Sequence, residues 1–321
     1  MGKLTSNVTT TLLMRVGPTE SIEKCYFEKT LQFSCAANWL DYALTHKNKT
    51  IGDVFECVFA QTFKGDPRIS DIVDSRGKPM GDHLLVLENT ADDSCILRYI
   101  PTILVPVMCF YSFNVERIRK ELANDGEPVG WFAFNLDEYC KDMDYNNDDA
   151  SYLFITDPPK FFHELKAMIP TAVSNNISNL TSKRFYGNFN PNEPLFFKDI
   201  EYHKHKRNEL FWDSPESMEE LFWKLPEYER QSELRCMIPN VNFVQTYNPN
   251  YGTYNRNSNT LNVYLPHLQE YAVIARASEA HSLYFGNFDN QAFSGDFAIL
   301  RMTFDEISSQ IKTNGEKTEL H

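Results

Sequence analysis

The sequence lacks the features that mark membrane and secreted proteins. Its longest apolar stretch, ILVPVMCFYSF, is shorter than the ~20 residues that a transmembrane helix needs. The N-terminal residues contain no continuous apolar segment of the kind found in signal peptides. The 7 cysteines are odd in number and show no C-x-x-C spacing, which is typical of a reducing compartment. We therefore expect a soluble cytoplasmic protein that makes no contact with a membrane.

Basic residues are too few to dominate the surface. The 31 Lys and Arg residues are outnumbered by 44 Asp and Glu residues, which gives a formal net charge of −13 at pH 7. Proteins that bind a nucleic-acid backbone usually carry excess positive charge, because contact with phosphates releases counterions. Direct contact with nucleic acid is therefore not expected. A protein partner is the favoured prediction, and a homo-oligomer is compatible with the composition.

Motifs that hold common cofactors are also absent from the sequence. There is no G-x-G-x-x-G, no G-x-x-x-x-G-K-[ST] and no H-E-x-x-H. His203 and His205 in EYHKHKR would share one face of a strand, which suits metal ligands, but the surrounding lysines favour an exposed basic edge strand. We expect no metal ion.

The apolar content is high enough for a folded protein with a large core. Hydrophobic residues make up 42% of the chain and aromatic residues 14%. Residue alternation predicts strands over VTTTLLMRV, LQFSC, HLLVLEN, SCILRYI, PTILVPVMCFYSF, GWFAFNL, SYLFITD, FFKDIEYHK, LNVYLP, YAVIARA and SLYFGN. Helical spacing predicts helices over SIEKCYFEK, AANWLDYALTHKN, PKFFHELKAMI and SMEELFWKL.

These elements follow no β-α-β rhythm, which argues against a doubly wound nucleotide-binding fold. We predict an α+β protein with mostly antiparallel, mixed sheets and short flanking helices. The whole chain, residues 1–321, is expected to form a single large domain with a weak subdivision near residues 142–182.

Charged and apolar residues are densely mixed in FWKLPEYERQSELR, residues 222–235. If residues 231–235 are extended, Gln231, Glu233 and Arg235 point to one face. A carboxylate flanked by an amide and a guanidinium can hold a pair of hydroxyls and stabilise developing positive charge. If the stretch is helical, Glu229 and Glu233 line one side instead. A third interpretation is a surface run of ion pairs that supports the following strand.

Two polar residues near the N-terminus also draw attention. Arg15 interrupts the apolar stretch VTTTLLMRV. A charge there must be paired, face a cleft, or lie on the outward side of a half-buried strand. Ser34 follows Phe33 shortly before a predicted helix, so it is either a site residue or a simple helix N-cap.

The order of these segments resembles two groups of proteins. LQFSCAANWLDY and IGDVFE, followed far downstream by FWKLPEYERQSELR, resemble a large uncharacterised group of bacterial and phage proteins with an F-x-K … Y-x-x-E-x-E-x-R element. The same skeleton is similar to ADP-ribosyltransferases of the Arg/Ser/Glu type, and that likeness extends the expected α+β fold to an ADP-ribosyltransferase-like one.

The second resemblance implies a catalytic set and a cofactor. It implies that Arg15 holds the phosphates of NAD and that Ser34 supports the nicotinamide pocket. Gln231 and Glu233 match its Q-x-E element, in which the glutamate hydrogen-bonds the ribose and favours an oxocarbenium-like transition state. The implied function is an ADP-ribosyltransferase-like or NAD-cleaving protein of a bacterial or phage conflict system.

A non-enzymatic function remains as the alternative. The acidic composition and the Tyr- and Asn-rich segment 246–256 would suit a phage or mobile-element protein that binds and inhibits a host antiviral defence complex.

Overall fold

The fold is described from a computed structural model, and the description covers only part of the chain. It covers residues 10–40, 57–58, 60–72, 79, 84–88, 93–114, 131–181, 189–202, 218–224, 226–243 and 260–286. His203, His205 and segment 246–256 therefore lie outside the described residues.

The chain divides into two compact units, each built from separate stretches of sequence. Unit 1 comprises Met1–Ser6, Gln32–Cys109 and Leu165–Val263, and unit 2 comprises Asn7–Leu31, Phe110–Glu164 and Tyr264–His321. The expectation of one large domain with a weak subdivision near residues 142–182 stays a prediction.

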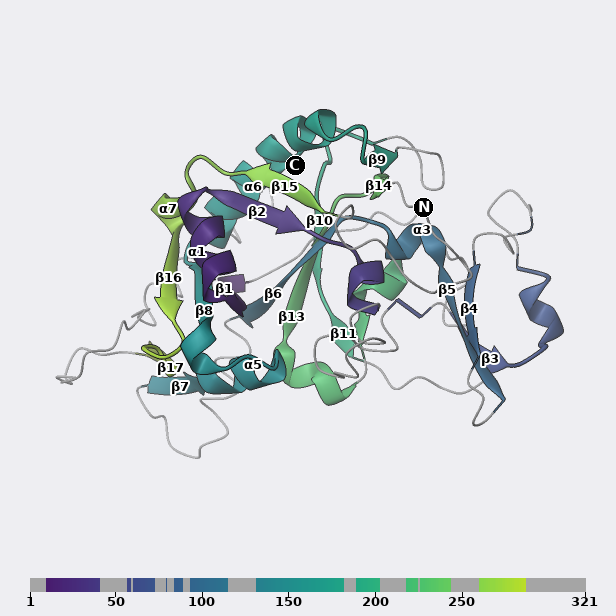
Figure 1. Ribbon diagram of the computed structural model, residues 1–321, viewed down its shortest axis with the longest axis horizontal. Helices are drawn as coiled ribbons and strands as arrows, with labels where there is room; N and C mark the ends of the chain where they lie inside the picture. The colour runs from purple at the N-terminus through teal and green to yellow at the C-terminus, as the bar shows by residue number, and fades with distance from the viewer. Residues whose placement is uncertain are drawn as a thin grey trace, which may run out of the picture. The chain divides into compact units, whose positions relative to one another are not determined.

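Short strands outnumber helices in the described part of the chain (Figure 1). The strands are β1 (Thr10–Pro18), β2 (Thr30–Phe33), β3 (Ala60–Phe63), β4 (Leu84–Glu88), β5 (Ser94–Tyr99), β6 (Val107–Asn114), β7 (Trp131–Asn135), β8 (Ala150–Ile155), β9 (Leu180–Thr181), β10 (Phe196–Asp199), β11 (Glu201–Tyr202), β12 (Trp223–Lys224), β13 (Glu233–Met237), β14 (Asn242–Phe243), β15 (Leu261–Tyr264), β16 (Ala272–Arg276) and β17 (Ser282–Gly286).

The helices are mostly short. The α-helices are α1 (Thr19–Phe27), α3 (Ile100–Ile103), α5 (Leu136–Asp142), α6 (Pro158–Asn175) and α7 (Leu268–Tyr271), and the 3-10 helices are η1 (Pro67–Ile69), η3 (Asn147–Asp149), η5 (Glu219–Phe222) and η6 (Pro226–Gln231). In the described part of the chain, no helix is long and apolar enough to cross a bilayer.

The main sheet has six strands in the order β10-β13-β6-β1-β8-β16. β1 pairs with β6 and β8, β8 with β16, and β10 with β13, and each of these pairs is antiparallel. Antiparallel neighbours need no long helical crossover between them, so short helices suffice as connections. The predicted α+β class, with mostly antiparallel sheets and short helices, is confirmed.

In unit 2, the two faces of β1 have different surroundings. Leu12, Met14 and Val16 alternate along the strand and point into a hydrophobic core shared with β8 and α5. The opposite face lies against α1, which Figure 1 draws beside β1 and β8. The approach is close, because a Cβ atom added to Gly17 would lie 3.4 Å from the Ile22 side chain of α1. β1 is therefore buried between a core and a helix.

Helix α6 forms where the apolar spacing predicts it. The Asp157 carboxylate accepts a hydrogen bond from the Lys160 backbone N–H at 3.0 Å, an N-cap that satisfies one of the unpaired donors of the first turn. Of the apolar residues at helical spacing, Phe161, Leu165 and Ile169 are fully buried and Met168 is half-buried.

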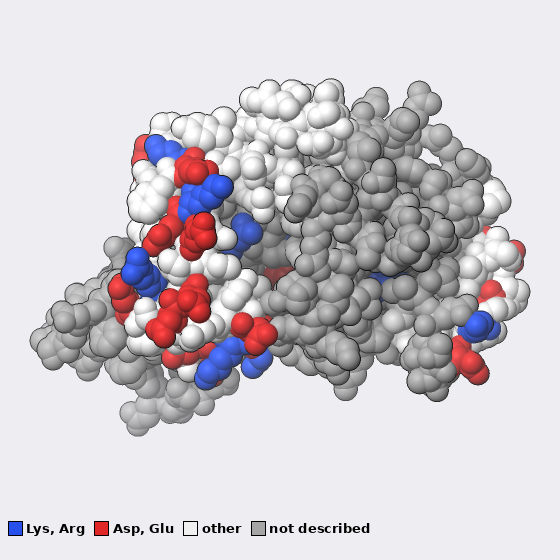
Figure 2. All heavy atoms as spheres, in the orientation of Figure 1, with Lys and Arg blue, Asp and Glu red and all other residues white. Residues whose placement is uncertain are grey.

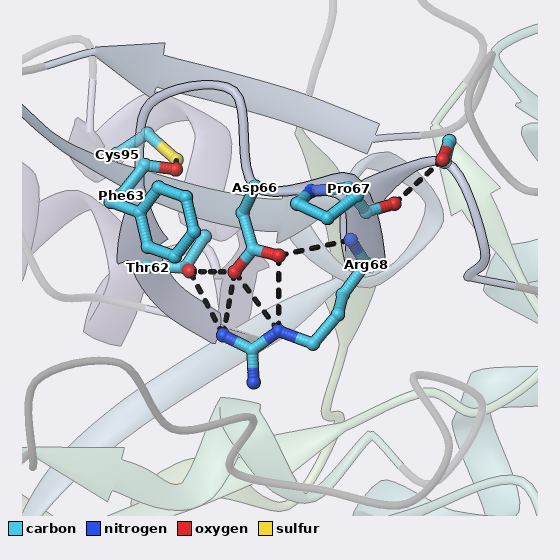
Figure 3. Close-up of polar contacts among 7 residues, drawn as sticks. Thr62, Phe63, Asp66, Pro67, Arg68 and Cys95 are labelled. Atoms are coloured by element: carbon cyan, nitrogen blue, oxygen red, sulfur yellow. Dashed lines mark hydrogen bonds and ion pairs between the residues drawn. The ribbon is translucent and has the colours of Figure 1, made fainter.

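In unit 1, β4 and β5, both predicted as strands, form an antiparallel pair, and β3 adds to the other side of β5. Asp66 ties the end of β3 to η1 (Figure 3). Its carboxylate accepts hydrogen bonds from the Thr62 hydroxyl and from the backbone N–H and guanidinium of Arg68. The hydrogen bond from the Arg68 side chain keeps the pKa of this carboxyl well below its usual range. This cluster is a local structural tie between a strand and a helix.

Some predicted elements are wrong in part. FFKDIEYHK is not one strand, because β10 ends at Asp199 and β11, which belongs to another sheet, begins at Glu201. PTILVPVMCFYSF is not one strand, because α3 occupies its start and β6 begins only at Val107. Pro101 lies in the first turn of α3, where the fixed φ of proline suits a helix. Within SMEELFWKL, the described residues form the 3-10 helix η5 followed by β12 and not an α-helix. There, pairing of β12 with β11 overrides the helical spacing of the sequence.

Candidate functional site

A group of buried charged and polar side chains lies in unit 1, where η6 leads into β13. Glu233, the first residue of β13, is 7% exposed. Its Oε1 lies 2.6 Å from Nε of Arg235, and its Oε2 lies 2.6 Å from Nζ of Lys224. The same Nζ donates a hydrogen bond to Oε1 of Gln231 at 2.9 Å. Lys224, Gln231, Glu233 and Arg235 are together called the buried charge cluster.

The backbone brings these side chains together by local means. Gln231 is the last residue of η6, and the next residue, Ser232, has a φ of 44°, in the left-handed region. This turn joins a helix to a strand within one residue. On the other side, Tyr202 of β11 is the register partner of Lys224, and its hydroxyl accepts a hydrogen bond from the Glu233 backbone N–H at 3.0 Å. The turn at Ser232 and the hydrogen bond from the Glu233 backbone N–H to Tyr202 therefore position Gln231 and Glu233 beside Lys224.

Each cation of the cluster also lies over an aromatic ring. The guanidinium carbon of Arg235 is 5.2 Å from the ring centroid of Trp39, and Nζ of Lys224 is 5.3 Å from that of Tyr228. Arg235 additionally donates a hydrogen bond to the backbone carbonyl of Leu221. The rings offset part of the cost of removing the two cations from water.

The surroundings keep Glu233 ionised. Burial alone would raise the pKa of its carboxyl group, but the charges of Arg235 and Lys224, with hydrogen bonds from Arg235 and the Cys109 thiol, hold the pKa well below its usual range. Burial raises the pKa of Cys109, and the negative charge of Glu233 raises it further. The same two causes raise the pKa of Tyr202 to about 12. Two cations against one carboxylate leave the cluster with one net positive charge.

Such a cluster is costly to keep as a purely structural feature. Buried ion pairs lose much of their Coulomb energy to desolvation, and well-packed apolar side chains often replace them without loss of stability. Strongly perturbed ionisable groups also concentrate at functional sites. An ionised carboxylate cannot donate a proton, but it can accept hydrogen bonds from sugar hydroxyls and stabilise a cation. This is the chemistry that the arrangement makes available.

The extended interpretation of residues 231–235 is correct only from Glu233 onward, because Gln231 ends η6 and Ser232 has a left-handed φ. Gln231 and Glu233 meet at the Lys224 ammonium, and Arg235 meets the other carboxylate oxygen. The interpretation as a surface run of ion pairs is wrong for these residues, since they are buried. The helical alternative is wrong as well, because Glu229 is exposed whereas Glu233 is buried.

Ser34 lies in unit 1, in a segment that approaches the cluster. It forms an antiparallel bridge with Val107 of β6, and its hydroxyl accepts a hydrogen bond from the Asn38 side chain at 2.8 Å. Cys109, which bonds to Glu233, lies two residues after Val107, and Trp39, which stacks on Arg235, lies five residues after Ser34. The two predicted site segments of unit 1 are thus joined through β6 and Trp39.

Arg15 lies in unit 2. It is half-buried on β1, opposite Leu153 of β8, and it shares the α1 side of the strand with Gly17. Burial raises the pKa of the Cys25 thiol on α1 to about 11, and the nearby positive charge of Arg15 opposes this rise. The convergence of Arg15 with Glu233 stays a prediction.

Several side chains of the cluster were not predicted as site residues. Lys224 belongs to the F-x-K motif, so the sequence contained a signal for it but not its role. Tyr228 lies in the same segment as Glu233, at the tyrosine of the quoted motif. Trp39, Cys109 and Tyr202 come from segments distant in sequence, and no local pattern links them to Glu233.

In the part of the chain that the structure describes, no group of three or more His, Cys, Asp and Glu side chains is placed to hold a metal ion. Comparisons of the chain with protein-family models, with curated proteins and with solved structures find no match. The chain is therefore characterised by its own geometry, as an α+β protein with a buried charge cluster in one unit.

Proposed function

We propose that the chain is an ADP-ribosyltransferase-like or NAD-cleaving protein of a bacterial or phage conflict system. The observation that carries this proposal is the ionised, buried carboxylate of Glu233, held between Lys224 and Arg235 beside the Gln231 amide. A carboxylate in this state is suited to stabilise positive charge on a ribose ring, because it stays negative over the whole physiological pH range.

The reaction breaks the bond between the anomeric carbon of the ribose and the nitrogen of nicotinamide. The nitrogen keeps the electron pair, and neutral nicotinamide leaves. The ribose ring carries the positive charge in the transition state, where Glu233 stabilises it. The oxygen of water, or of an acceptor hydroxyl, then bonds to the anomeric carbon and releases its proton to solvent. Glu233 remains ionised throughout.

The other candidate residues have supporting roles in this proposal. Gln231 fixes the orientation of the ribose together with Glu233, and Ser34 supports the nicotinamide pocket. Binding of the NAD phosphates by Arg15 stays a prediction from the resemblance.

Replacing Glu233 with glutamine tests the proposal directly. Gln keeps the size of the side chain and one oxygen acceptor but removes the negative charge. Release of nicotinamide from NAD should fall by about 10²–10³-fold, the usual effect of removing one preorganised electrostatic contact to a transition state. Nicotinamide release is followed by chromatography, and thermal unfolding shows whether the fold is intact.

The matched control is Glu270→Gln. Glu270 is an exposed carboxylate of α7 in unit 2 that pairs with Lys160 at 2.8 Å, so its loss removes a charge without touching the cluster. Turnover should be unchanged in this variant. Absence of NAD consumption by the wild-type protein, or equal turnover in wild type and Glu233→Gln, would contradict the proposed function.

A second candidate function is a non-enzymatic protein that binds and inhibits a host antiviral defence complex. The observation that favours it is the exposed end of α1 in unit 2. Phe27 is 65% exposed, and its ring lies edge-on to Tyr26 with centroids 5.4 Å apart. Figure 2 shows acidic and basic side chains mixed over the described surface of unit 2, and Glu20 and Glu28 flank these rings along the sequence. Aromatic side chains with a charged rim are typical of protein interfaces.

If this candidate is correct, Phe27→Ala should weaken the complex by tenfold or more, because exposed aromatic anchors often contribute more than about 1.4 kcal/mol to binding. The measurement is the dissociation constant between purified chain and a defence-complex component that co-purifies with it. Ile177→Ala, at another exposed apolar side chain, serves as the control. A chain that remains solitary and monomeric in host lysate would exclude this candidate.

A further inference from the structure

We propose that Lys224 is the positioning residue that sets Gln231 and Glu233 in one fixed arrangement, a role that rests on the function proposed above. Lys224 would not touch the substrate. It would act through the two side chains that do.

The geometry of Lys224 supports this role. Its Nζ lies 2.9 Å from the amide oxygen of Gln231 and 2.6 Å from a carboxylate oxygen of Glu233. A single ammonium therefore fixes the direction of both side chains. Lys224 comes from β12, a different strand from the one that Glu233 begins, so the contact joins two elements.

The backbone turn between Gln231 and Glu233 is a conformation that contacts from other elements must stabilise. Ser232 has a left-handed φ of 44°, a conformation that costs a non-glycine residue free energy and persists where its surroundings impose it. The Lys224 ammonium, bonded on both sides of this turn, is one such constraint. Tyr202, the register partner of Lys224, adds a second by accepting the Glu233 backbone N–H.

Arg235 has a different part in the cluster. It binds the other oxygen of Glu233 from within the same strand and is itself fixed by the Leu221 carbonyl and the Trp39 ring. The charged and titratable groups that face Glu233 are thus Lys224 from β12, Arg235 from β13, Cys109 from β6 and Tyr202 from β11. The Lys224 ammonium contacts both Glu233 and Gln231 and so links these two side chains.

The test compares Lys224→Met with Lys224→Arg. In the Met variant, kcat for NAD cleavage should fall by about 10–100-fold with KM little changed, as is usual when a supporting contact is lost. Lys224→Arg keeps a positive charge at the same position and should retain most of the wild-type kcat. Lys198→Met, on β10 opposite Arg235, is the control, because the Lys198 ammonium pairs with Glu201.

A second readout does not depend on turnover. The pKa of Glu233, followed by NMR of carboxyl-labelled glutamate and identified by its loss in Glu233→Gln, should rise in Lys224→Met, because one of two stabilising cations is gone. It should stay low in Lys224→Arg and in Lys198→Met. The acid limb of the kcat profile should move to higher pH together with that pKa.

The outcomes separate this inference from the proposed function. An unchanged Glu233 pKa in Lys224→Met, or an Arg variant no more active than the Met variant at equal thermal stability, would overturn the positioning role. If the wild-type protein never consumes NAD but the Glu233 pKa still rises in Lys224→Met, the proposed function is contradicted. The role of Lys224 in positioning Gln231 and Glu233 is then still supported.

Discussion

Replacing Arg235 with methionine should lower the free energy of unfolding by about 3–5 kcal/mol, the range expected when one partner of a buried ion pair is removed. Arg235 is 1% exposed, and its loss leaves one Glu233 oxygen without its cation. The Leu221 carbonyl and the Trp39 ring lose their contacts in the same step. Urea unfolding followed by tryptophan fluorescence would measure the change.

The control for this experiment is Arg276→Met in unit 2. The Arg276 side chain is 60% exposed, and its Nη2 atom lies 3.4 Å from Oε1 of Glu23. Exposed pairs of this kind contribute about 0–1 kcal/mol. Equal destabilisation in the two variants would contradict the view that burial makes the Arg235 contact strong.

The second large effect concerns the aromatic core of unit 2. Phe161→Ala should destabilise the protein by about 3–5 kcal/mol, because the removed ring leaves a cavity that its neighbours fill only in part. Phe161 is fully buried at the start of α6, and its ring centroid lies 5.5 Å from that of Phe110 and 6.2 Å from that of Tyr271. Thermal and urea unfolding would report the loss.

Phe27→Ala removes the same chemical group from an exposed position and provides the comparison. It should change the free energy of unfolding by no more than about 0.5 kcal/mol. A loss in Phe161→Ala as small as that of Phe27→Ala would show that the ring cluster around α6 does not stabilise unit 2.

Much of the secondary structure follows from short-range patterns. β8, β15 and β16 lie where β-branched and aromatic residues cluster, and α6 lies where apolar residues recur at helical spacing. Its N-cap, Asp157, and the prolines after it are local signals as well. Such features depend on neighbours within a few residues, which the sequence displays directly.

The failures arise where distant contacts decide the conformation. Residues 223–224 form a strand because β11 pairs with them, although their spacing favours a helix. Residues 100–103 form a helical turn before β6, although the run of apolar residues favours one long strand. Besides the local preference of Pro101, distant residues contact this turn: Asn242 donates a hydrogen bond to the Pro101 carbonyl, and the Thr102 hydroxyl donates one to Glu220. None of these contacts can be read from the residues that take part in them.

The site shows the same division. The alternation of Gln231, Glu233 and Arg235 predicts that their side chains share one face of a strand. Glu233 and Arg235 do lie on β13 and pair there, whereas Gln231 ends η6 and reaches the cluster through Lys224. No local pattern in the sequence predicts that the Lys224 ammonium and the Cys109 thiol converge on Glu233. The position of the Trp39 ring over Arg235 has no local pattern either.

By itself, the sequence determined the α+β class, the position of most strands and the set of polar residues available near residue 233, because propensity and alternation act over a few residues. Only the tertiary structure decided that these polar residues are buried, that Glu233 is paired with two cations, and that its carboxyl group stays ionised. Burial and charge pairing depend on which segments pack together, and a pKa is set by the groups that surround a side chain in space.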